Sequence, residues 1–568
     1  MKSIIITLAA FFLTAMTTLH AAESNRPNII VILTDDMGFS DIGPYGGEIQ
    51  TPNLDKLAAG GMKFSQFYNC AKCEPSRASL LTGQQWWTKS PKVAVRKDTP
   101  NIGEVMRLAG YRSMMVGKWH VDGNPFERGF DRHFGFMGGG TDSLLGDESF
   151  TLDGKPWPVP KENFYATTAL TDYAVKFIRE ERTAHADQPF FLYLAYNAPH
   201  APLQAPAERV AKYRGRYLKG WDVIRRERFE KQKALGLAGS GWLFPERPQN
   251  IPAWETLDAK SQDFEDLRMA TYAAMVDCVD EGVGRVMQAL DELKIREHTL
   301  VIFLNDNGAS PNDRVRRGEF GTPGTTWNVG LPWAHVSNTP FKYYKRAQHG
   351  GGITAPFIAH WPAAIAPRKD FQDQPCHLID LLPTFIELAG ATYPADFGGK
   401  EHPPLPGVSL VPVLKRNETL PPRTLHFSLF NNMALIRDGW KIASSYSQPW
   451  QLYDLTNDRT ETRDLAKERP EKLQELLAMQ KAFQAQSEVA LRLQAGEREP
   501  EYAPIYKADG TRGPGAREDV DDAAFAFLIA QARSQGRQLS DAELEDFRKQ
   551  AAAKPDSGAK RKKPNAKN

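Results

Sequence analysis

The chain has 568 residues, of which 41% are hydrophobic and 25% are charged, as is usual for a soluble globular protein. This length predicts one large domain with a smaller second domain. The formal net charge of +2 provides no concentrated positive charge for a phosphate backbone, so we exclude nucleic acid as a partner.

The first residues predict an export signal. Lys2 precedes a mostly apolar run from Ile4 to Ala15, and the small residues Ala21 and Ala22 follow, where a signal peptidase could cut. The run is shorter than the ~20 residues that span a bilayer. We therefore expect residues 1–22 to be removed and the mature protein to be periplasmic or secreted, without stable membrane insertion. An uncleaved membrane anchor is the alternative.

Four cysteines are too few for a disulfide scaffold in so long a chain: Cys70, Cys73, Cys278 and Cys376. Cys70 and Cys73 have the C-x-x-C spacing of redox and zinc sites. No second such pair and no suitably spaced pair of histidines accompanies them, so the sequence offers little support for zinc. Cys73 needs a different explanation.

Short apolar runs alternate with helical stretches along most of the chain. Residues 28–33, 190–195 and 300–304 have the pattern of buried parallel strands, and helices are expected over 167–181 and 269–293. This alternation predicts an α/β fold with a large, mostly parallel sheet between helices. Ligands of such sheets bind beyond the carboxyl ends of the strands, where polar clusters stand in this sequence.

The pattern changes near residue 420. Several short strand-like runs and then a helix from about 468 to 486 predict a smaller antiparallel sheet backed by a helix. From about residue 495 the composition is polar and rich in Gly, Pro and charge. We predict a main domain over 23–420, a C-terminal subdomain over 421–495 and a polar, partly disordered tail over 496–568.

The string Cys73-Glu74-Pro75-Ser76-Arg77, followed by A-S-L-L-T-G, predicts a helix that starts at Cys73. Pro75 suits the first turn of a helix. At the N-terminal end the helix dipole and free N–H groups favour negative charge, so Cys73 is a candidate nucleophile, with a thiolate as one interpretation. Arg77, one turn along, is expected to face the same point and could bind an anion.

Acidic residues follow two of the predicted strands. Asp35 and Asp36 come after the first strand, and Asp306 and Asn307 after the strand at 300–304. Adjacent carboxylates repel each other unless a cation lies between them. Three carboxylates and an amide oxygen suit a hard cation such as Ca²⁺ or Mg²⁺.

Basic residues and histidines follow other predicted strands. Lys118 and His120 belong to Gly-Lys-Trp-His, which ends a strand-like run over 111–116. His200 belongs to Ala-Pro-His after the strand at 190–195. Lys345 ends the string S-N-T-P-F-K-Y-Y-K, which leads into three glycines and an apolar strand.

These strings resemble the type I sulfatases of the alkaline phosphatase superfamily. C-x-P-S-R with A-S-L-L-T-G is that family's signature, and G-K-W-H, A-P-H and the arylsulfatase pattern S-N-T-P-F-R-x-Y-K match it from about Arg26 to about Leu465. The resemblance implies an alkaline phosphatase-like fold, with 23–420 as the catalytic domain. It also implies hydrolysis of aryl or carbohydrate sulfate esters. A formylglycine-generating enzyme would oxidise Cys73 to formylglycine, whose hydrated aldehyde is the nucleophile.

The resemblance also implies the site residues. One calcium ion would be bound by Asp35, Asp36, Cys73, Asp306 and Asn307. The implied catalytic residues are Cys73, Arg77, Lys118, His120, His200 and Lys345. Two positions depart from the family pattern, since Lys342 stands where Arg is usual and Gly350 where an acid is expected before Gly-Gly.

Two other functions use the same residues. A phosphonate monoester or phosphodiester hydrolase needs the same modified cysteine and a related metal site, and an inactive homologue would bind sulfated glycans without cleaving them. We expect the substrate to be a sulfated small molecule or a sulfated glycan. The segments 138–157, 213–254 and 311–333 carry many aromatic and charged residues, a composition that favours a cleft that binds sugars.

Overall fold

The computed structural model describes residues 26–86, 99–239, 241–312, 318–402, 404–429, 432–446 and 448–486. The predicted signal peptide (1–22) and the predicted tail (496–568) lie outside these ranges. Within them, no helix combines the length and the apolar character needed to cross a membrane.

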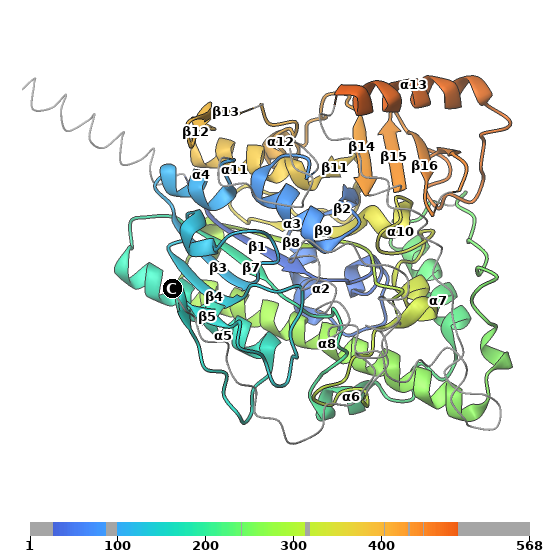
Figure 1. Ribbon diagram of the computed structural model, residues 1–568, viewed down its shortest axis with the longest axis horizontal. Coiled ribbons are helices and arrows are strands. Elements are labelled where there is room, and N and C mark those ends of the chain that lie inside the picture. The colour runs from blue at the N-terminus through green and yellow to red at the C-terminus, as the bar shows by residue number, and fades with distance from the viewer. Residues whose placement is uncertain are drawn as a thin grey trace, which may run out of the picture.

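An eleven-stranded sheet forms the centre of the molecule (Figure 1). Strand β1 (Asn28–Thr34) lies between β7 (Phe190–Ala195) and β8 (Thr299–Asn305) and is parallel to both. All seven residues of β1 are buried, which explains its continuous apolar sequence. The other strands are β2 (Met62–Tyr68), β3 (Arg112–Lys118), β4 (Arg132–Phe136), β5 (Thr151–Leu152), β6 (Lys155–Pro156), β9 (Thr354–His360), β10 (Phe371–Gln372) and β11 (Cys376–His377).

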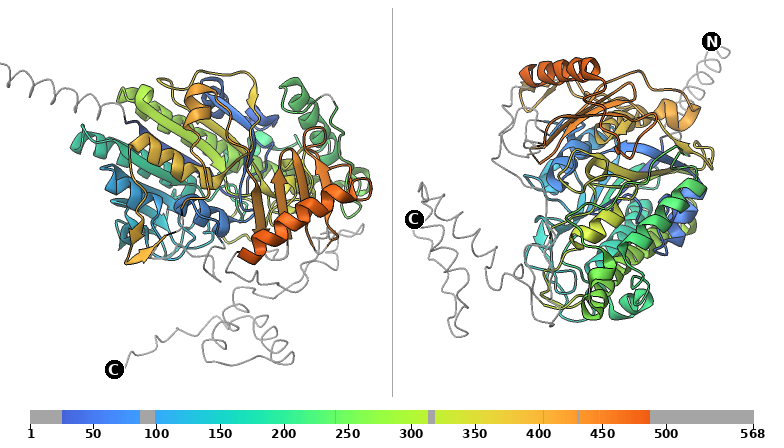
Figure 2. Two further views of the ribbon diagram at one scale, coloured as in Figure 1. Left: turned by 90° about the horizontal axis from the view of Figure 1, so that it is seen from above. Right: turned by 90° about the vertical axis from the view of Figure 1, so that its right-hand side faces the viewer.

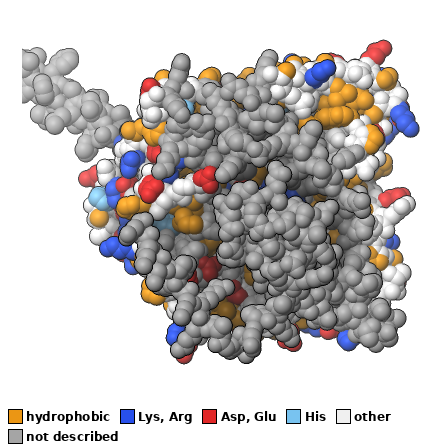
Figure 3. Space-filling view, in the orientation of Figure 1, with side chains coloured by type: hydrophobic (Ala, Val, Ile, Leu, Met, Phe, Trp, Pro, Cys, Tyr) orange, Lys and Arg blue, Asp and Glu red, His pale blue; other side chains and the backbone are white. Residues whose placement is uncertain are grey.

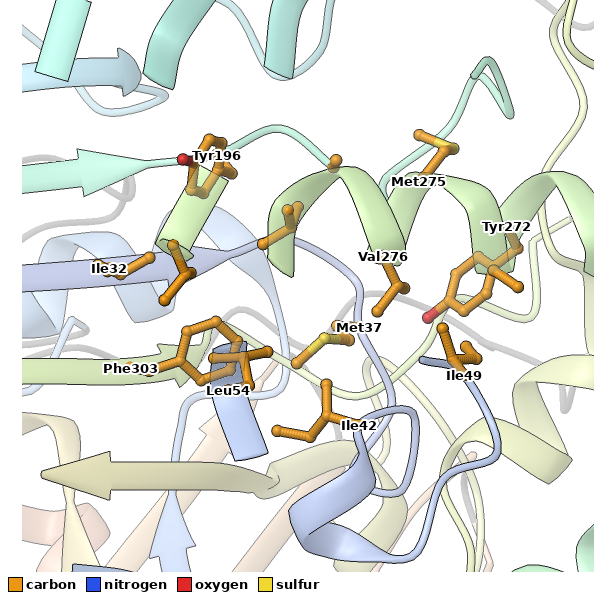
Figure 4. Packing of buried hydrophobic residues seen from close by; sticks show 14 of the residues in the cluster. Ile32, Met37, Ile42, Ile49, Leu54, Tyr196, Tyr272, Met275, Val276 and Phe303 are labelled. Carbon is orange, nitrogen blue, oxygen red and sulfur yellow. The ribbon is translucent and has the colours of Figure 1, made fainter. Parts of the chain in front are cut away.

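Helices cover both faces of this sheet, as Figures 1 and 2 show. The side chains of β1 alternate between two cores: Ile30 and Ile32 face one, and Ile29 and Val31 face the other. The first core lies under α2 (Pro52–Ala59), α5 (Ala166–Ala184) and α8 (Ala259–Glu292), and Figure 4 shows Ile32 in it with Phe303, Leu54 and Val276. The second core lies under α3 (Cys73–Thr82), α4 (Ile102–Leu108) and α11 (Leu381–Ala389).

The smaller elements connect the strands and helices of this layered core. The remaining helices are η1 (Gly43–Tyr45), η2 (Pro125–Arg128), α6 (Ala207–Tyr213), α7 (Trp221–Ala234), η3 (Trp254–Thr256), η4 (Arg296–His298), α9 (Gly330–Ser337), α10 (Gly350–Ile353), η5 (Leu378–Asp380) and α12 (Val411–Arg416). A separate two-stranded sheet pairs β12 (Asp396–Phe397) with β13 (Lys400–Glu401).

A second, antiparallel sheet follows in the C-terminal part. Its strands are β14 (Leu425–Leu429), β15 (Asn432–Arg437), β16 (Trp440–Ser444) and β17 (Gln451–Asp454), paired in chain order. One face packs on the main domain through Phe427 and Tyr68. The helix α13 (Pro470–Gln486) covers the other face, and Figure 3 shows hydrophobic side chains gathered over this part of the molecule.

The architecture confirms the predicted fold class, including the antiparallel subdomain with its helix. The strands and helix of that subdomain fall within the predicted range 421–495. Strands β1, β3, β7 and β8 are mutually parallel neighbours in the sheet, so their carboxyl ends meet at one edge. Most candidate site residues lie at or just after these four ends, whereas Cys73 and Arg77 follow β2 and Lys345 lies between α9 and α10.

Candidate active site

The acidic residues that follow β1 and β8 meet at this edge of the sheet. The backbone N–H of Asp36 donates to Asp306 Oδ1 at 3.3 Å, and Asn307 Nδ2 donates to Asp36 Oδ1 at 2.6 Å. Together with Asp35, these residues are at most 3% exposed. The structure thus brings together the four oxygen-bearing side chains that the sequence predicts.

Buried side chains from distant parts of the chain hold the loop after β1. Asp41 accepts from the backbone N–H of Gly38 at 2.7 Å and from the Tyr272 hydroxyl at 2.6 Å. Arg228 of α7 donates to Asp41 at 2.7 Å. No local sequence pattern predicts these three side chains, because Tyr272 and Arg228 lie 231 and 187 positions from Asp41.

Three cations face the three carboxylates. Lys118 donates to Asp35, and Lys345 donates to Asp36 Oδ1 at 2.6 Å. Arg77 donates to Asp306 Oδ2 at 3.0 Å and to the Lys118 carbonyl at 2.9 Å. Each predicted basic residue therefore neutralises a carboxylate, which reduces the cost of burying charge here.

The surroundings shift the pKa values of two of these carboxyl groups in opposite directions. Burial raises the pKa of Asp306 well above its usual value, and the negative Asp35 beside it raises it further. Burial also acts to raise the pKa of Asp35, but nearby cations, first Lys118, lower it below its usual range. A divalent cation at this point would stabilise both carboxylates in their charged form.

Three oxygens of this cluster accept no hydrogen bond from any residue that the structure describes. They are Asp35 Oδ1, Asp36 Oδ2 and Asn307 Oδ1, and all are buried. Buried polar atoms in proteins are nearly always partnered. Asp35, Asp36 and His200 each offer one ligand atom within 4.8 Å of the others. Carboxylate and amide oxygens in this number fit a hard divalent cation such as calcium.

Cys73 is the first residue of α3 and is 3% exposed. Ser76 shapes the entry to this helix by accepting the backbone N–H of Cys70 at 3.0 Å. Burial acts to lower the pKa of Lys345, but the negative charge of Asp36 and then that of Cys73 raise it above its usual value. The four cysteines are free, so Cys70 and Cys73 form no disulfide.

Both predicted histidines border the cluster, with side chains about one-fifth exposed. His200 Nδ1 lies 2.7 Å from the Ala201 carbonyl, which requires a proton on Nδ1, and Nε2 lies 3.6 Å from Asp36 Oδ2. His120 Nε2 lies 3.3 Å from Glu74 Oε1. Burial lowers the pKa of each imidazole. Glu74 was not predicted, because it occupies the variable position of C-x-P-S-R.

A glycine run after β4 lies against both histidines. A Cβ atom at Gly139 would be 2.7 Å from His120 Nε2, and one at Gly140 would be 3.6 Å from the His200 ring. The backbone N–H of His120 donates to the Met137 carbonyl at 3.2 Å, which ties the two segments together. The run thus forms one wall of the site.

The two departures from the family pattern lie outside this cluster. Lys342 Nζ is 3.5 Å from the Tyr453 hydroxyl, on the side of the C-terminal sheet. At Gly350 a Cβ atom would lie 2.9 Å from the Phe341 ring, so the backbone there leaves little room for an acidic side chain.

Three tryptophans of the segments 213–254 and 311–333 belong to the core and not to a sugar-binding cleft, whereas Trp157 and Trp242 are partly exposed. Trp221, Trp254 and Trp333 are at most 5% exposed and pack on one another, with ring centroids 4.8 Å apart for Trp221 and Trp254 and 5.8 Å apart for Trp221 and Trp333. Composition could not reveal this, because aromatic side chains serve a core and a binding cleft equally well.

Known proteins are similar to this chain in sequence and in fold. The sequence model described as Sulfatase matches residues 27–391, and the one described as N-sulphoglucosamine sulphohydrolase, C-terminal, matches residues 341–488. An arylsulfatase of Klebsiella aerogenes is 34% identical over 435 residues, which cover 69% of this chain and 92% of that protein. An N-acetylgalactosamine-6-sulfatase of Rattus norvegicus is 29% identical and covers 68% and 66%.

Solved structures agree with these relatives. The structure of Ps i-CgsB in complex with k-i-k-neocarrahexaose has a TM-score of 0.62 and 27% identity, and the match covers 83% of this chain and 95% of that one. The fold and the sequence matches define a type I sulfatase of the alkaline phosphatase superfamily. The chain belongs to the sulfatase family, and it is an enzyme that hydrolyses sulfate esters. The predicted resemblance is therefore confirmed.

Replacing Gly139 by alanine should displace the His120 imidazole and lower the activity. Because the new methyl group would lie 2.7 Å from His120 Nε2, the imidazole must move, and we expect kcat/KM for an aryl sulfate to fall by about tenfold or more. Gly138→Ala is the matched control, since a Cβ there meets nothing closer than 3.5 Å. Equal activity of the two variants would contradict this geometry.

Proposed function

We propose that this sulfatase acts through Cys73 after its oxidation to formylglycine, with one calcium ion held by Asp35, Asp36, Asp306, Asn307 and residue 73. The observation that carries the proposal is the set of three buried oxygens that have no hydrogen-bond partner among the described residues, in the cluster that Arg77 of α3 joins. These oxygens are the ligands that calcium prefers. The family match supports the same assignment.

The modified residue 73, the calcium ion and the side chains of the site have separate roles in the reaction. The hydrated aldehyde supplies the attacking hydroxyl, and calcium supplies positive charge for the sulfate oxygens. Arg77, Lys118 and Lys345 stabilise the charge on the transferred sulfuryl group, because they are buried and fixed before the substrate arrives. Water is largely excluded from their side chains, which strengthens these interactions.

Proton transfers fall to the residues around this centre. Asp306 accepts the proton of the attacking hydroxyl, and His200 with Lys345 assists the departing alcohol or phenol oxygen. His120 takes the proton of the second hydroxyl when sulfate leaves. Glu74, at 3.3 Å from His120 Nε2, orients that imidazole.

We propose a sulfated glycan as the natural substrate. The similar structure of Ps i-CgsB was determined with an oligosaccharide, k-i-k-neocarrahexaose, and its sequence identity of 27% supports a related substrate class here. The predicted signal peptide supports export to the periplasm or beyond, where such glycans occur. Maturation then requires a formylglycine-generating enzyme as a partner.

Removal of calcium should inactivate the enzyme and destabilise it. Without the ion, like-charged carboxylates at the ends of β1 and β8 repel each other. We expect chelation to abolish sulfate release and lower Tm, and added Ca²⁺ to restore both, with a gain of about 2.7 kcal/mol at 100 times Kd. The variant Asn307→Ala should show a smaller gain. Full activity in metal-free protein, verified by elemental analysis, would contradict the proposal.

Relative rates on three substrates test the reaction class. We expect the matured enzyme to release sulfate from a sulfated oligosaccharide and from an aryl sulfate, with a lower kcat/KM on phenyl phosphonate, because the site lies in a sulfatase scaffold. Faster hydrolysis of the phosphonate would favour the alternative phosphonate monoester hydrolase. Binding of sulfated glycan by fully matured protein, without any release of sulfate, would favour the inactive homologue.

A further inference from the structure

The segment that carries Lys345 lies directly on the catalytic loops. The backbone N–H of Lys345 donates to the Ala309 carbonyl at 3.1 Å, just beyond Asp306 and Asn307. The N–H of Arg346 donates to the Ala71 carbonyl at 2.7 Å, two residues before Cys73. A shift of this segment would therefore move the Lys345 ammonium group relative to Cys73.

The backbone around Lys345 has an unfavourable conformation. Tyr343 has φ of 64° and Arg346 has φ of 81°, and both lie in the left-handed region that side-chain-bearing residues rarely adopt. Such a conformation is unfavourable for a residue with a side chain and persists only where surrounding contacts impose it. Contacts outside the segment must supply that constraint.

The C-terminal subdomain supplies these contacts on the outer side. Asn432 Nδ2 donates to the Arg346 carbonyl at 2.9 Å. Ser445 Oγ accepts the backbone N–H of Gln348 at 2.9 Å and lies 3.0 Å from His349 Nδ1. The segment is thus held between the catalytic loops and the antiparallel sheet.

A buried carboxylate completes this support. Both oxygens of Glu461 accept the backbone N–H of Gly350, at 3.1 and 2.9 Å. The carboxylate also pairs with Lys441, and both side chains are 1% exposed. Gly350 is the position where the family pattern suggests an acid, and a carboxylate from the C-terminal subdomain reaches it instead.

We propose that Glu461 is a positioning residue of the sulfatase reaction, which holds the segment 345–350 and through it the Lys345 ammonium group. This inference rests on the proposed role of Lys345 in assisting the leaving oxygen. It makes the C-terminal subdomain a working part of the active site, although Glu461 itself touches no catalytic side chain. Poor leaving groups, which need the ammonium group most, depend most strongly on this contact.

Two double variants isolate the contact with Gly350. K441M/E461Q and K441M/E461L both remove the buried charges and keep similar volumes, so neither leaves an unpaired charge. Only the glutamine keeps an oxygen that can accept the Gly350 N–H. With a saccharide sulfate we expect kcat of K441M/E461L to be about tenfold below that of K441M/E461Q, and the ratio to shrink with 4-nitrophenyl sulfate. Rates are measured well below the Tm of both variants.

Further variants separate the possible failures. E104Q breaks a different buried ion pair, between Glu104 and Arg128, and should lower Tm while kcat is unchanged. K345A should lower kcat on both substrates; an unchanged kcat would overturn the role of Lys345 and this inference with it. If K345A is impaired but the two double variants have equal kcat, only the role of Glu461 is overturned.

If K441M/E461L does not fold, the milder variant S445A tests the same proposal. S445A removes one hydroxyl that holds Gln348 and His349, and little else. We expect about threefold lower kcat on the saccharide sulfate and a smaller effect on 4-nitrophenyl sulfate. An unchanged kcat on both substrates would overturn the proposal that the subdomain positions Lys345.

Discussion

Three buried carboxylates lie side by side at the carboxyl ends of β1 and β8, and the structure around them must offset the cost of burying their negative charge. Arg77, Lys118 and Lys345 arrive from three different parts of the chain, each to pair with one of them. Unpaired, such charges would cost several kcal/mol each. The sheet order places β1 between β7 and β8 and so makes this meeting possible. Three oxygens of this cluster accept no hydrogen bond from the described part of the chain, and they complete an environment suited to a divalent cation.

Much of the fold and of the candidate site could be predicted because its signals are local. Buried parallel strands such as β1 have continuous apolar sequences, Asp35 and Asp306 stand directly after such strands, and His200 lies in the loop that follows β7. Contacts between distant residues have no such signal. Arg228 supports Asp41 across 187 positions, and Glu461 reaches Gly350 across 111. Aromatic composition alone could not predict which tryptophans are buried, since buried and ligand-binding tryptophans look alike in a sequence.

The C-terminal subdomain also contacts the segment that carries Lys345. Its inner face packs on the main domain, and its polar groups satisfy the backbone of the segment that carries Lys345. That segment forms no regular strand, so its N–H and C=O groups need partners from elsewhere. The C-terminal subdomain provides several of them, from Asn432 in β15 and from Ser445 and Glu461 in the loops after β16 and β17.

The proposed mechanism depends on the conversion of Cys73 to an aldehyde. Mass spectrometry of the peptide that contains Cys73, after production with a formylglycine-generating enzyme, tests it most directly. Conversion lowers the mass of this peptide by about 18 Da relative to the thiol form, because the CH₂SH group becomes CHO. An unmodified thiol, under conditions that convert a control sulfatase sequence, would contradict the account and turn attention to a thiolate nucleophile.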